Sequence, residues 1–434
     1  MGQPRLGGAE RFEEYVKKLG DAIGHADRRK PLREYLTGLL LAGERKSVEP
    51  MAAKIDPLHV PARHQSMHHF VANAPWEERA VLEVAREYAL QQLERHAPVA
   101  AWVIDDTGMP KKGTHSVGVA HQYCGVLGKS ENCQVAVTIS LVNNTMSVPC
   151  AYRLYLPESW ARNRARRAEA RIPTEVRFRP KWQIALEEVD QMLRDGLPRA
   201  PVVADAGYGV VTEFRDGITA RGLSYAVGIS KETTVWPPGM EPLPPRSRKK
   251  KRRRGRPASL LRRSAEHRPV SVLELAKRLR LTEWQSIAWR EGTRGTMRSR
   301  FALVRVRPAH RDNLRSTARE PEWLIIEWPR SQPEPTKYWL STAPQTAAVE
   351  DLIGLIKIRW RIERDFEELK DEIGLDHFEG RSWRGFHHHG ALSIAAYAFL
   401  AAERARLSPP EPLAFLRPAR LPKGFRPRGA ALAG

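Results

Sequence analysis

Apolar residues recur along much of the chain at two spacings, one typical of helices and one of strands. The clearest helical stripe lies between Leu355 and Gly374, where apolar residues follow one another at steps of three and four: Leu355, Ile358, Ile362, Phe366, Leu369 and Ile373. We predict one amphipathic helix over this stretch. Arg359, Glu363 and Lys370 are spaced by four and seven positions, so they share a second, polar face. This face is either a solvated, ion-paired surface or a metal ligand beside a phosphate-binding edge.

Residues 1–97 also show helical spacing, interrupted by prolines at positions 57, 61 and 75. We predict a helical N-terminal domain that binds DNA. The histidines between His64 and Trp76 are assigned to turns and packing, because no Cys or acidic residue lies at metal-ligand spacing. The predicted helices are Glu10–Leu19, Pro31–Leu41, Val48–Ile55 and Trp76–His96.

Strand patterns dominate residues 98–230. The run Val99–Ile104 predicts a buried strand that stops at Asp105, Asp106 and a turn. Two strands separated by Asn143 and Asn144 predict a hairpin. The further predictions are strands at Gln134–Val142, Ser147–Leu156, Pro201–Asp205 and Ser224–Ile229, helices at Lys181–Arg194 and Thr212–Arg221, and an arginine-dense loop over 157–180.

Composition adds a partner to this picture. The 434 residues include 72 Lys and Arg against 50 Asp and Glu, a formal charge of +22. Such an excess indicates a polyanion, most simply nucleic acid. No apolar run is long enough to span a bilayer, and the first residues lack an apolar signal core. Three cysteines without CxxC spacing suit a reducing compartment, so we expect a cytoplasmic, nucleoid-associated protein without membrane contact.

The pattern changes between residues 231 and 340, which we interpret as a basic linker followed by a β-rich insertion. Nine of the eleven residues from Arg246 to Arg256 are basic, as in solvated phosphate binders. Arg254-Gly255-Arg256-Pro257 also has the form of a minor-groove arm. Strands are predicted at Thr282–Arg290, Ser299–Val306, Glu322–Trp328 and Lys337–Ser341. A buried helix is predicted at Gly390–Arg406, and residues 407–434, rich in Pro and Arg, are predicted to be a disordered basic tail.

Three acids stand where a metal site could form. Asp106 and Asp205 end apolar runs, and Glu363 lies on the amphipathic helix. If the two strands are neighbours, their acids converge at one edge of the sheet and Glu363 closes the site. Three carboxylates can hold two Mg²⁺ ions, which prefer oxygen ligands. A pair of such ions about 4 Å apart supports in-line phosphoryl displacement.

The spacing of the polar helix residues is the most specific signal. Arg359 is followed after three residues by Glu363 and after six more by Lys370. With the two strand-end acids, this resembles the DDE superfamily of insertion-sequence transposases and their Tyr-Arg-Glu-Lys signature. The signature's Tyr position holds Ile356 here, a departure. The stretches HQYCGVLGKSENCQVAV and LPESWARNRARRAEARIP resemble the insertion-sequence family 701 branch.

The resemblance implies a fold and a reaction. The fold would be a ribonuclease-H-like mixed α/β sheet flanked by helices, over residues 98–230 and 341–406, with the β-rich insertion before the last catalytic helix. Asp106, Asp205 and Glu363 would bind two Mg²⁺ ions, with Mn²⁺ as a substitute. The activity would be cut-and-paste DNA transposition by a homodimer on double-stranded DNA, at terminal inverted repeats and a target. The DNA contacts that the resemblance implies are Arg359 and Lys370. The basic run adds further expected DNA contacts: Lys249, Lys250, Lys251, Arg252, Arg253 and Arg254.

Alternatives remain open at this stage. Asp105 could be the first ligand in place of Asp106, and Trp289 is a guess for a tryptophan that stacks on a flipped base. His387, His388 and His389 are consecutive, so their side chains diverge and indicate packing or DNA contacts rather than one metal site. The competing function is a catalytically inactive DNA-binding protein derived from a transposase. A plain Mg²⁺ nuclease or an RNA-binding protein explains the insertion and the basic arms less well.

Overall fold

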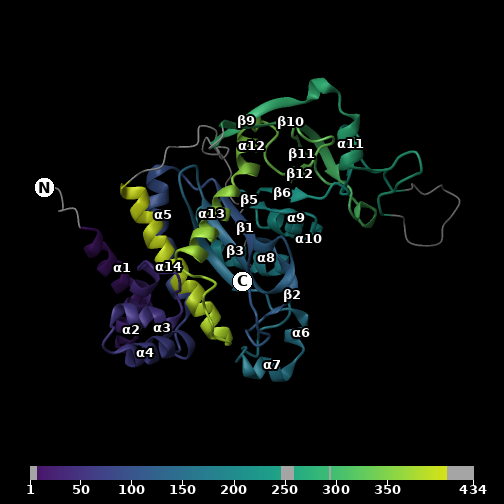
Figure 1. Cartoon of the computed structure of the whole chain (residues 1–434). Coiled ribbons are helices and arrows are strands. Elements are labelled where there is room, and N and C mark those ends of the chain that lie inside the picture. The colour runs from purple at the N-terminus through teal and green to yellow at the C-terminus, as the bar shows by residue number, and fades with distance from the viewer. Residues whose placement is uncertain (1–6, 246–258, 293–294, 408–434) are drawn as a thin grey trace, which may run out of the picture.

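One large sheet runs through the computed structural model, which describes residues 7–245, 259–292 and 295–407 (Figure 1). Within these ranges the sheet has twelve strands in the order β2-β3-β1-β5-β6-β12-β11-β10-β7-β8, with β4 beside β3 and β9 beside β10. The mixed α/β fold with helices around a sheet is therefore confirmed. The strands are β1 (Ala101–Pro110), β2 (Ala120–Cys124), β3 (Lys129–Val142), β4 (Ser147–Leu154), β5 (Val202–Ala204), β6 (Tyr225–Ile229), β7 (Thr234–Trp236), β8 (Val270–Ser271), β9 (Gln285–Gly292), β10 (Gly295–Pro308), β11 (Glu322–Trp328) and β12 (Lys337–Ser341).

The centre of the sheet is parallel and its two sides are antiparallel. β1 pairs with β5 and β5 with β6 in parallel, while β3 and β4 form the predicted hairpin beside β1. The helices α8 (Lys181–Arg194) and α10 (Thr212–Ala220) lead into the parallel strands β5 and β6. The β-rich segment continues the same sheet, because β12 pairs with β6 and then β11 and β10 follow.

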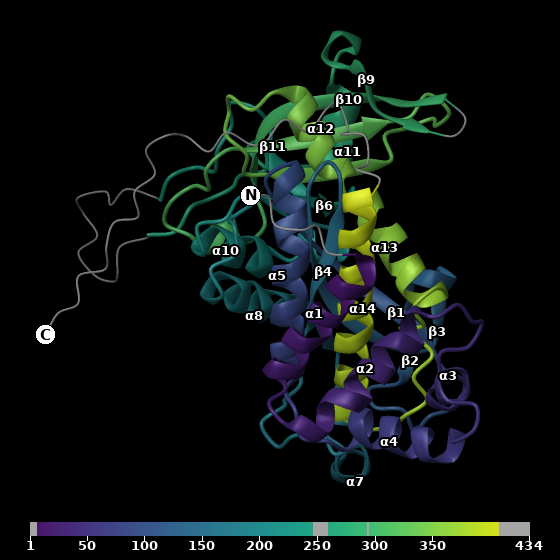
Figure 2. The ribbon, with the colours of Figure 1, turned by 90° about the vertical axis from the view of Figure 1, so that its left-hand side faces the viewer.

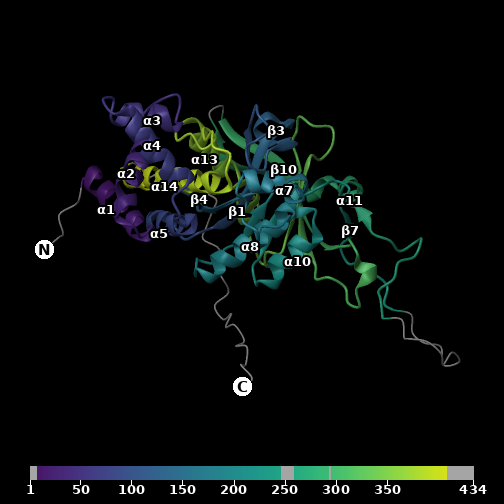
Figure 3. The same cartoon turned by 90° about the horizontal axis from the view of Figure 1, so that it is seen from below.

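The N-terminal helices pack around the last helix of the described chain. α14 (Trp383–Leu407) contacts α2, α4 and α5, and Figure 2 shows α14 lying among them. Figure 3 shows this helical group at one end of the molecule and α11 (Val272–Arg278) at the other. The group consists of α1 (Gly8–Ala22), α2 (Ala26–Leu40), α3 (Val48–Ile55), α4 (Val60–Ala72) and α5 (Glu78–His96).

Two of the three consecutive histidines of α14, His388 and His389, contact the N-terminal part of the chain. All three are buried, and the structure gives them packing roles. The ring of His388 stacks on Trp76 with ring centres 3.5 Å apart, and the hydroxyl of Tyr35 lies 2.8 Å from Nδ1 of His389. Burial lowers the pKa of His388 and of His389 to about 4, so both rings are neutral at pH 7.

Several predicted elements differ from the observed ones. The strand expected to stop at Asp105 and Asp106 continues to Pro110, since β1 pairs with β3 along its whole length. β2 was not predicted. The block around His64 is largely the helix α4, and the arginine-dense loop contains α6 (Glu158–Ala161) and α7 (Arg164–Glu169).

The single helix predicted from Leu355 to Gly374 is also wrong. Two helices, α12 (Val349–Lys357) and α13 (Trp360–Asp371), are separated by a turn at Ile358 and Arg359. The apolar stripe runs across the turn because both helices bury residues of the stripe. The remaining short helices are α9 (Ala206–Gly209), η1 (Gly125–Leu127), η2 (Leu281–Glu283) and η3 (Asp312–Leu314).

Two features bear on the expected surroundings of the chain. Among the helices of the described ranges, none combines the length and the apolar character needed to cross a bilayer. The basic run from Arg246 to Arg256 and the predicted tail from residue 408 onward lie outside the described residues.

Candidate functional site

Two acids come together because β1 and β5 are parallel neighbours. Val103 pairs with Val203 and Ile104 with Ala204, so the next step along both strands places Asp105 beside Asp205. Side chains alternate between the two faces of a strand. Asp105 therefore shares a face with Val103, which packs in one apolar cluster with residues of α12 and α13.

Asp205 is held by the backbone that follows it. It is the N-cap residue of α9, and its Oδ1 accepts hydrogen bonds from the amides of Gly207 (2.9 Å) and Tyr208 (3.4 Å). Acidic side chains at this position satisfy otherwise unpaired amides of the first helical turn. The strand end and the short helix thus fix the orientation of the carboxylate.

Arg359 lies against this pair of acids. The turn between α12 and α13 directs its guanidinium to Asp105, where Nη2 donates to Oδ2 over 2.7 Å. Burial raises the pKa of Asp105; Arg359 opposes the shift, and the charge of Asp205 adds to it. Burial alone would lower the pKa of Arg359, but Asp105, Asp205 and Glu363 outweigh it and the pKa is raised.

Glu363 stands one helical turn after Arg359 on α13, with an exposed side chain. The three carboxyl groups of Asp105, Asp205 and Glu363 therefore all act on one guanidinium. They are not gathered at metal-ligand distances: within the described ranges, no three His, Cys, Asp or Glu side chains lie close enough together to hold an ion. Asp105 makes the hydrogen bond to Arg359, while Asp205 and Glu363 act on the pKa of Arg359 through their charges.

Asp106, predicted as the first metal ligand, lies elsewhere. It points to the opposite face of β1, where its carboxylate accepts hydrogen bonds from the hydroxyl of Tyr208 (2.6 Å) and from Nζ of Lys181 (2.8 Å). Two adjacent residues of a strand cannot face the same way. The structure thus places Asp106 and Asp105 on opposite faces of β1.

The predicted DNA contacts have mixed positions. Arg359 is engaged with Asp105, and the side chain of Lys370 is buried, with only 8% of the residue exposed. Burial lowers the pKa of Lys370. Trp289 also has internal contacts, because Nζ of Lys357 lies 4.3 Å from its ring centre and Phe301 packs edge-on against it. The run from Lys249 to Arg254 lies outside the described residues.

Comparison with known proteins identifies the family. The family model described as "DDE superfamily endonuclease" matches residues 18–296. The chain belongs to this family. The matched range contains Asp105, Asp106 and Asp205 and ends before α12 and α13, so it does not include Glu363.

Two similar proteins carry transposase names. Over 197 residues the chain is 29% identical to the probable transposase for insertion sequence element IS701 of Microchaete diplosiphon, which is 45% of this chain and 48% of that protein. The match thus spans about half the length of the curated relative. The cryo-EM structure of a piggyBac transposase synaptic complex with hairpin DNA is 11% identical with a TM-score of 0.39, covering 91% of this chain and 72% of that one. A likeness at that level carries no conclusion.

The sequence interpretation of this DDE-family chain missed the residues that support the acids. Tyr208 and Lys181 hold Asp106, and Tyr208 also belongs to the helix that Asp205 caps. Tyr208 stands three residues after Asp205 in VVADAGYG, a polar aromatic residue in an otherwise small-residue turn. That spacing was the available signal, whereas Lys181 lies far away in sequence and gave none.

Gly209 is predicted to be essential for the position of Asp205. A Cβ atom there would lie 1.9 Å from the carbonyl oxygen of Gly228 on β6. Gly209→Ala should therefore push α9 off the sheet and lower the free energy of unfolding by about 3 kcal/mol, as overpacking does. Urea unfolding measures this, with Gly113→Ala as the control because no described atom lies within 4 Å of a Cβ there. Equal midpoints for both variants would contradict the prediction.

Proposed function

We propose that the chain is a DNA transposase, which cuts the ends of an insertion sequence and joins them to target DNA. The observation that carries the proposal is the pair Asp105 and Asp205 on adjacent parallel strands, with Asp105 hydrogen-bonded to Arg359, which precedes Glu363 by one helical turn. The membership in the DDE superfamily endonuclease family and the similarity to a named transposase support it. We also propose that residues 98–230 and 341–406 form a ribonuclease-H-like catalytic unit.

The donor set suits a hard divalent cation. Asp105, Asp205 and Glu363 offer carboxylate oxygens, which Mg²⁺ and Mn²⁺ prefer. We assign these three residues as the ligands, with Asp105 in place of Asp106 because Asp106 faces away from α13. When bound, two such ions would supply an activated water and offset the charge that develops on the attacked phosphate.

The chain's own residues prepare this site. Arg359 holds the Asp105 carboxylate in one orientation through its hydrogen bond and neutralises part of the local negative charge. The amides of α9 do the same for Asp205. Because Arg359 donates a hydrogen bond to Asp105, a cation bound to that carboxylate would compete with the guanidinium.

The partner in this proposal is double-stranded DNA. The formal charge of +22 provides the electrostatic attraction to phosphates that such binding requires. A homodimer on the DNA, acting at two terminal inverted repeats, remains part of the proposal. The second candidate is a catalytically inactive DNA-binding descendant of a transposase, favoured by Ile356, which replaces the signature Tyr and is buried in the core against the sheet.

Strand cleavage distinguishes these candidates. The purified full chain is incubated with a supercoiled plasmid that carries the sequences flanking the gene, in Mg²⁺, in Mn²⁺ and in EDTA. A transposase is expected to nick at the element's boundary and leave a 3′-hydroxyl, with divalent metal only. Binding of that DNA with no nicking in either metal would refute the proposal in favour of the inactive descendant.

A further inference from the structure

The hairpin formed by β2, η1 and the start of β3 exposes large apolar side chains. Tyr123 is 63% exposed, Val126 60% and Leu127 42%. They belong to one short turn, and a solvated turn could form equally well with polar side chains at these positions. Apolar side chains gathered at the surface commonly mark a binding site.

This hairpin tip is held firmly beside the strand of the acids. Cys124 packs directly on Gly108 of β1, where a Cβ atom would lie 2.9 Å from its sulfur. η1 contacts β1 as well as β3. Gly108 follows Asp105 by three residues on β1, so the tip packs on the strand of the proposed site, three residues further along and on the face of Asp106.

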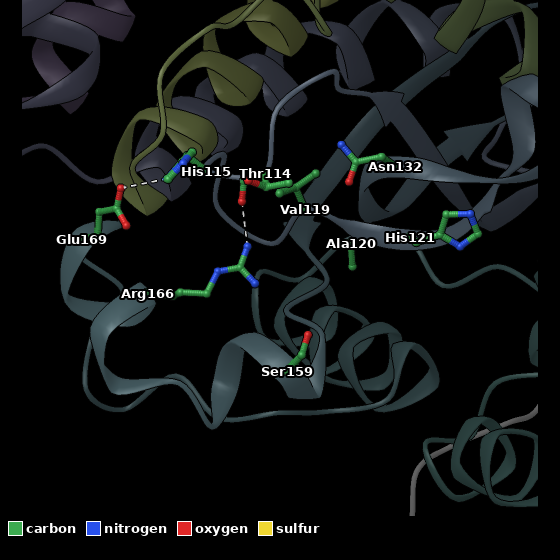
Figure 4. Close-up of a pocket in the computed structure, with 9 residues that line it drawn as sticks. All are labelled: Thr114, His115, Val119, Ala120, His121, Asn132, Ser159, Arg166 and Glu169. Carbon is green, nitrogen blue, oxygen red and sulfur yellow. Dashed lines mark hydrogen bonds and ion pairs between the residues drawn. The ribbon is translucent and has the colours of Figure 1, made fainter.

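A pocket of about 540 Å³ opens beside the same hairpin (Figure 4). Its wall contains β2, the loop before it, and α6 with α7, and Figure 4 shows Arg166 reaching toward Thr114. The guanidinium of Arg166 stacks 3.7 Å above the ring of Trp160 and donates to the carbonyl of Thr114 over 2.7 Å. The lining residues are Thr114, His115, Val119, Ala120, His121, Asn132, Ser159, Arg166 and Glu169.

The chemistry of this pocket suits an anion. Glu169, the one carboxylate among the lining residues, lies 3.2 Å from His115 and is paired there. Arg166, His121 and Ser159 offer nitrogen and hydroxyl donors, which phosphate oxygens accept. The stacking on Trp160 fixes the plane of the guanidinium, so little conformational freedom is lost when it binds.

The pocket and the apolar tip form one continuous surface. His121 lines the pocket, and Tyr123 follows two residues later on the same face of β2, both with exposed side chains. Proteins bind unpaired nucleic acid with phosphates in a groove that offers hydrogen-bond donors and with bases stacked on neighbouring aromatic side chains. The Arg166 guanidinium in the pocket and the ring of Tyr123 at the tip offer these two kinds of contact.

We propose that this surface binds an unpaired stretch of DNA strand next to the cleavage site. A backbone phosphate occupies the pocket at Arg166, and bases stack on Tyr123 and against Leu127. The inference rests on the proposed function, since it assigns the substrate of that site a single-stranded segment. A transposase must handle such a segment whenever it separates or holds a DNA end.

The test compares two DNA probes with the full-length protein in EDTA, by fluorescence anisotropy. One probe is a blunt duplex of about 30 base pairs, and the other is the same duplex with an oligo-dT arm of about eight nucleotides containing 2-aminopurine. The wild type should bind the armed duplex about tenfold more tightly and quench the 2-aminopurine. The double variant Tyr123→Ala/Leu127→Ser should lose both effects and bind the blunt duplex as before.

A second variant tests the pocket. Arg166→Gln should reduce the salt dependence of binding to the armed duplex by about one phosphate contact. The matched controls are Leu314→Ser, at a residue that is 64% exposed, and Arg194→Gln, at an exposed residue whose side chain donates a hydrogen bond to Gln191. Both controls should bind both probes like the wild type, and thermal melting checks that every variant is folded.

The outcomes separate the inference from the function. If the folded hairpin variant keeps the wild-type preference for the arm, the inference is overturned. The inference is also overturned if the double hairpin variant binds both probes like the wild type but light scattering shows a smaller mass for the protein without DNA. The tip would then be a contact between two copies of the chain. If the wild type cuts DNA and yet binds both probes equally, the inference alone fails. If the wild type binds neither probe, the proposed function fails with it.

Discussion

Replacing Asp105 with Asn is expected to abolish strand cleavage, lowering its rate by at least about a thousandfold, which is about 4 kcal/mol of activation free energy. Asn keeps the size of the side chain and removes the charge that faces Arg359 and Asp205. A neutral amide is a poor ligand for a hard divalent cation. DNA binding should remain, because the substitution takes a negative charge from the site. The measurement is the rate of metal-dependent nicking beside the affinity for the same DNA.

Asp106→Asn is the matched control. It changes the neighbouring residue in the same chemical way, on the face of β1 where the carboxylate meets Tyr208 and Lys181. Its expected cost is about 1 kcal/mol of stability, typical of one weakened ion pair, with nicking retained within about tenfold. The reverse ranking, with Asp106→Asn inactive and Asp105→Asn active, would restore Asp106 as the ligand and refute our assignment.

Arg359→Met is expected to have the second largest effect. It leaves the carboxylate of Asp105, 18% exposed, beside Asp205 without its cation. Removing one partner of a buried ion pair costs about 3–5 kcal/mol, and partial exposure places this case near the lower end. The midpoint of urea unfolding should fall accordingly, and nicking should fall with it, because the orientation of Asp105 depends on this hydrogen bond.

Arg364→Met provides the comparison on the same helix. Arg364 is 71% exposed and lies 3.3 Å from Glu368, one turn along α13. An exposed pair at this spacing contributes about 0.5 kcal/mol or less, so both unfolding and nicking should stay near the wild type. If the two substitutions lowered the free energy of unfolding equally, the contact between Arg359 and Asp105 would contribute no more to stability than an exposed ion pair.

The positions of most strands could be predicted from the sequence. The face of the sheet to which each acid points could not. β11 and β12 begin and end at the predicted residues, because apolar runs bounded by turn residues suffice to locate them. β1 extends further than predicted, since Thr107 and Gly108 have the composition of a turn but pair with Ala136 and Val135 of β3. Pairing across a sheet is a non-local property, and the local pattern did not contain it.

The choice between two adjacent acids shows the same limit. Alternation states that Asp105 and Asp106 face opposite ways, but only the packing of α12 and α13 decides which face they cover. The turn at Ile358 and Arg359 was missed for a related reason. No Gly or Pro marks it, and the apolar stripe continues through it because both helices pack on the sheet.

Lys370 illustrates what spacing alone cannot establish. Its distance in sequence from Glu363 placed it correctly on the same helix, α13, but did not reveal that the packing around this helix buries it. Lys370 is buried, and burial is the main reason why its pKa is lowered. The residue's role in binding DNA therefore stays a prediction.

The packing of α14 among the first five helices affects how the protein can be made. Those helices are translated first, and the faces that pack on α14 remain uncovered until residues 383–407 have left the ribosome. Contacts between such distant segments slow folding and leave apolar surface exposed in the meantime. A product that stops before Trp383 would lack the helix that completes this core, so premature termination should yield material that is degraded or aggregates rather than a shortened, DNA-binding competitor of the full-length protein.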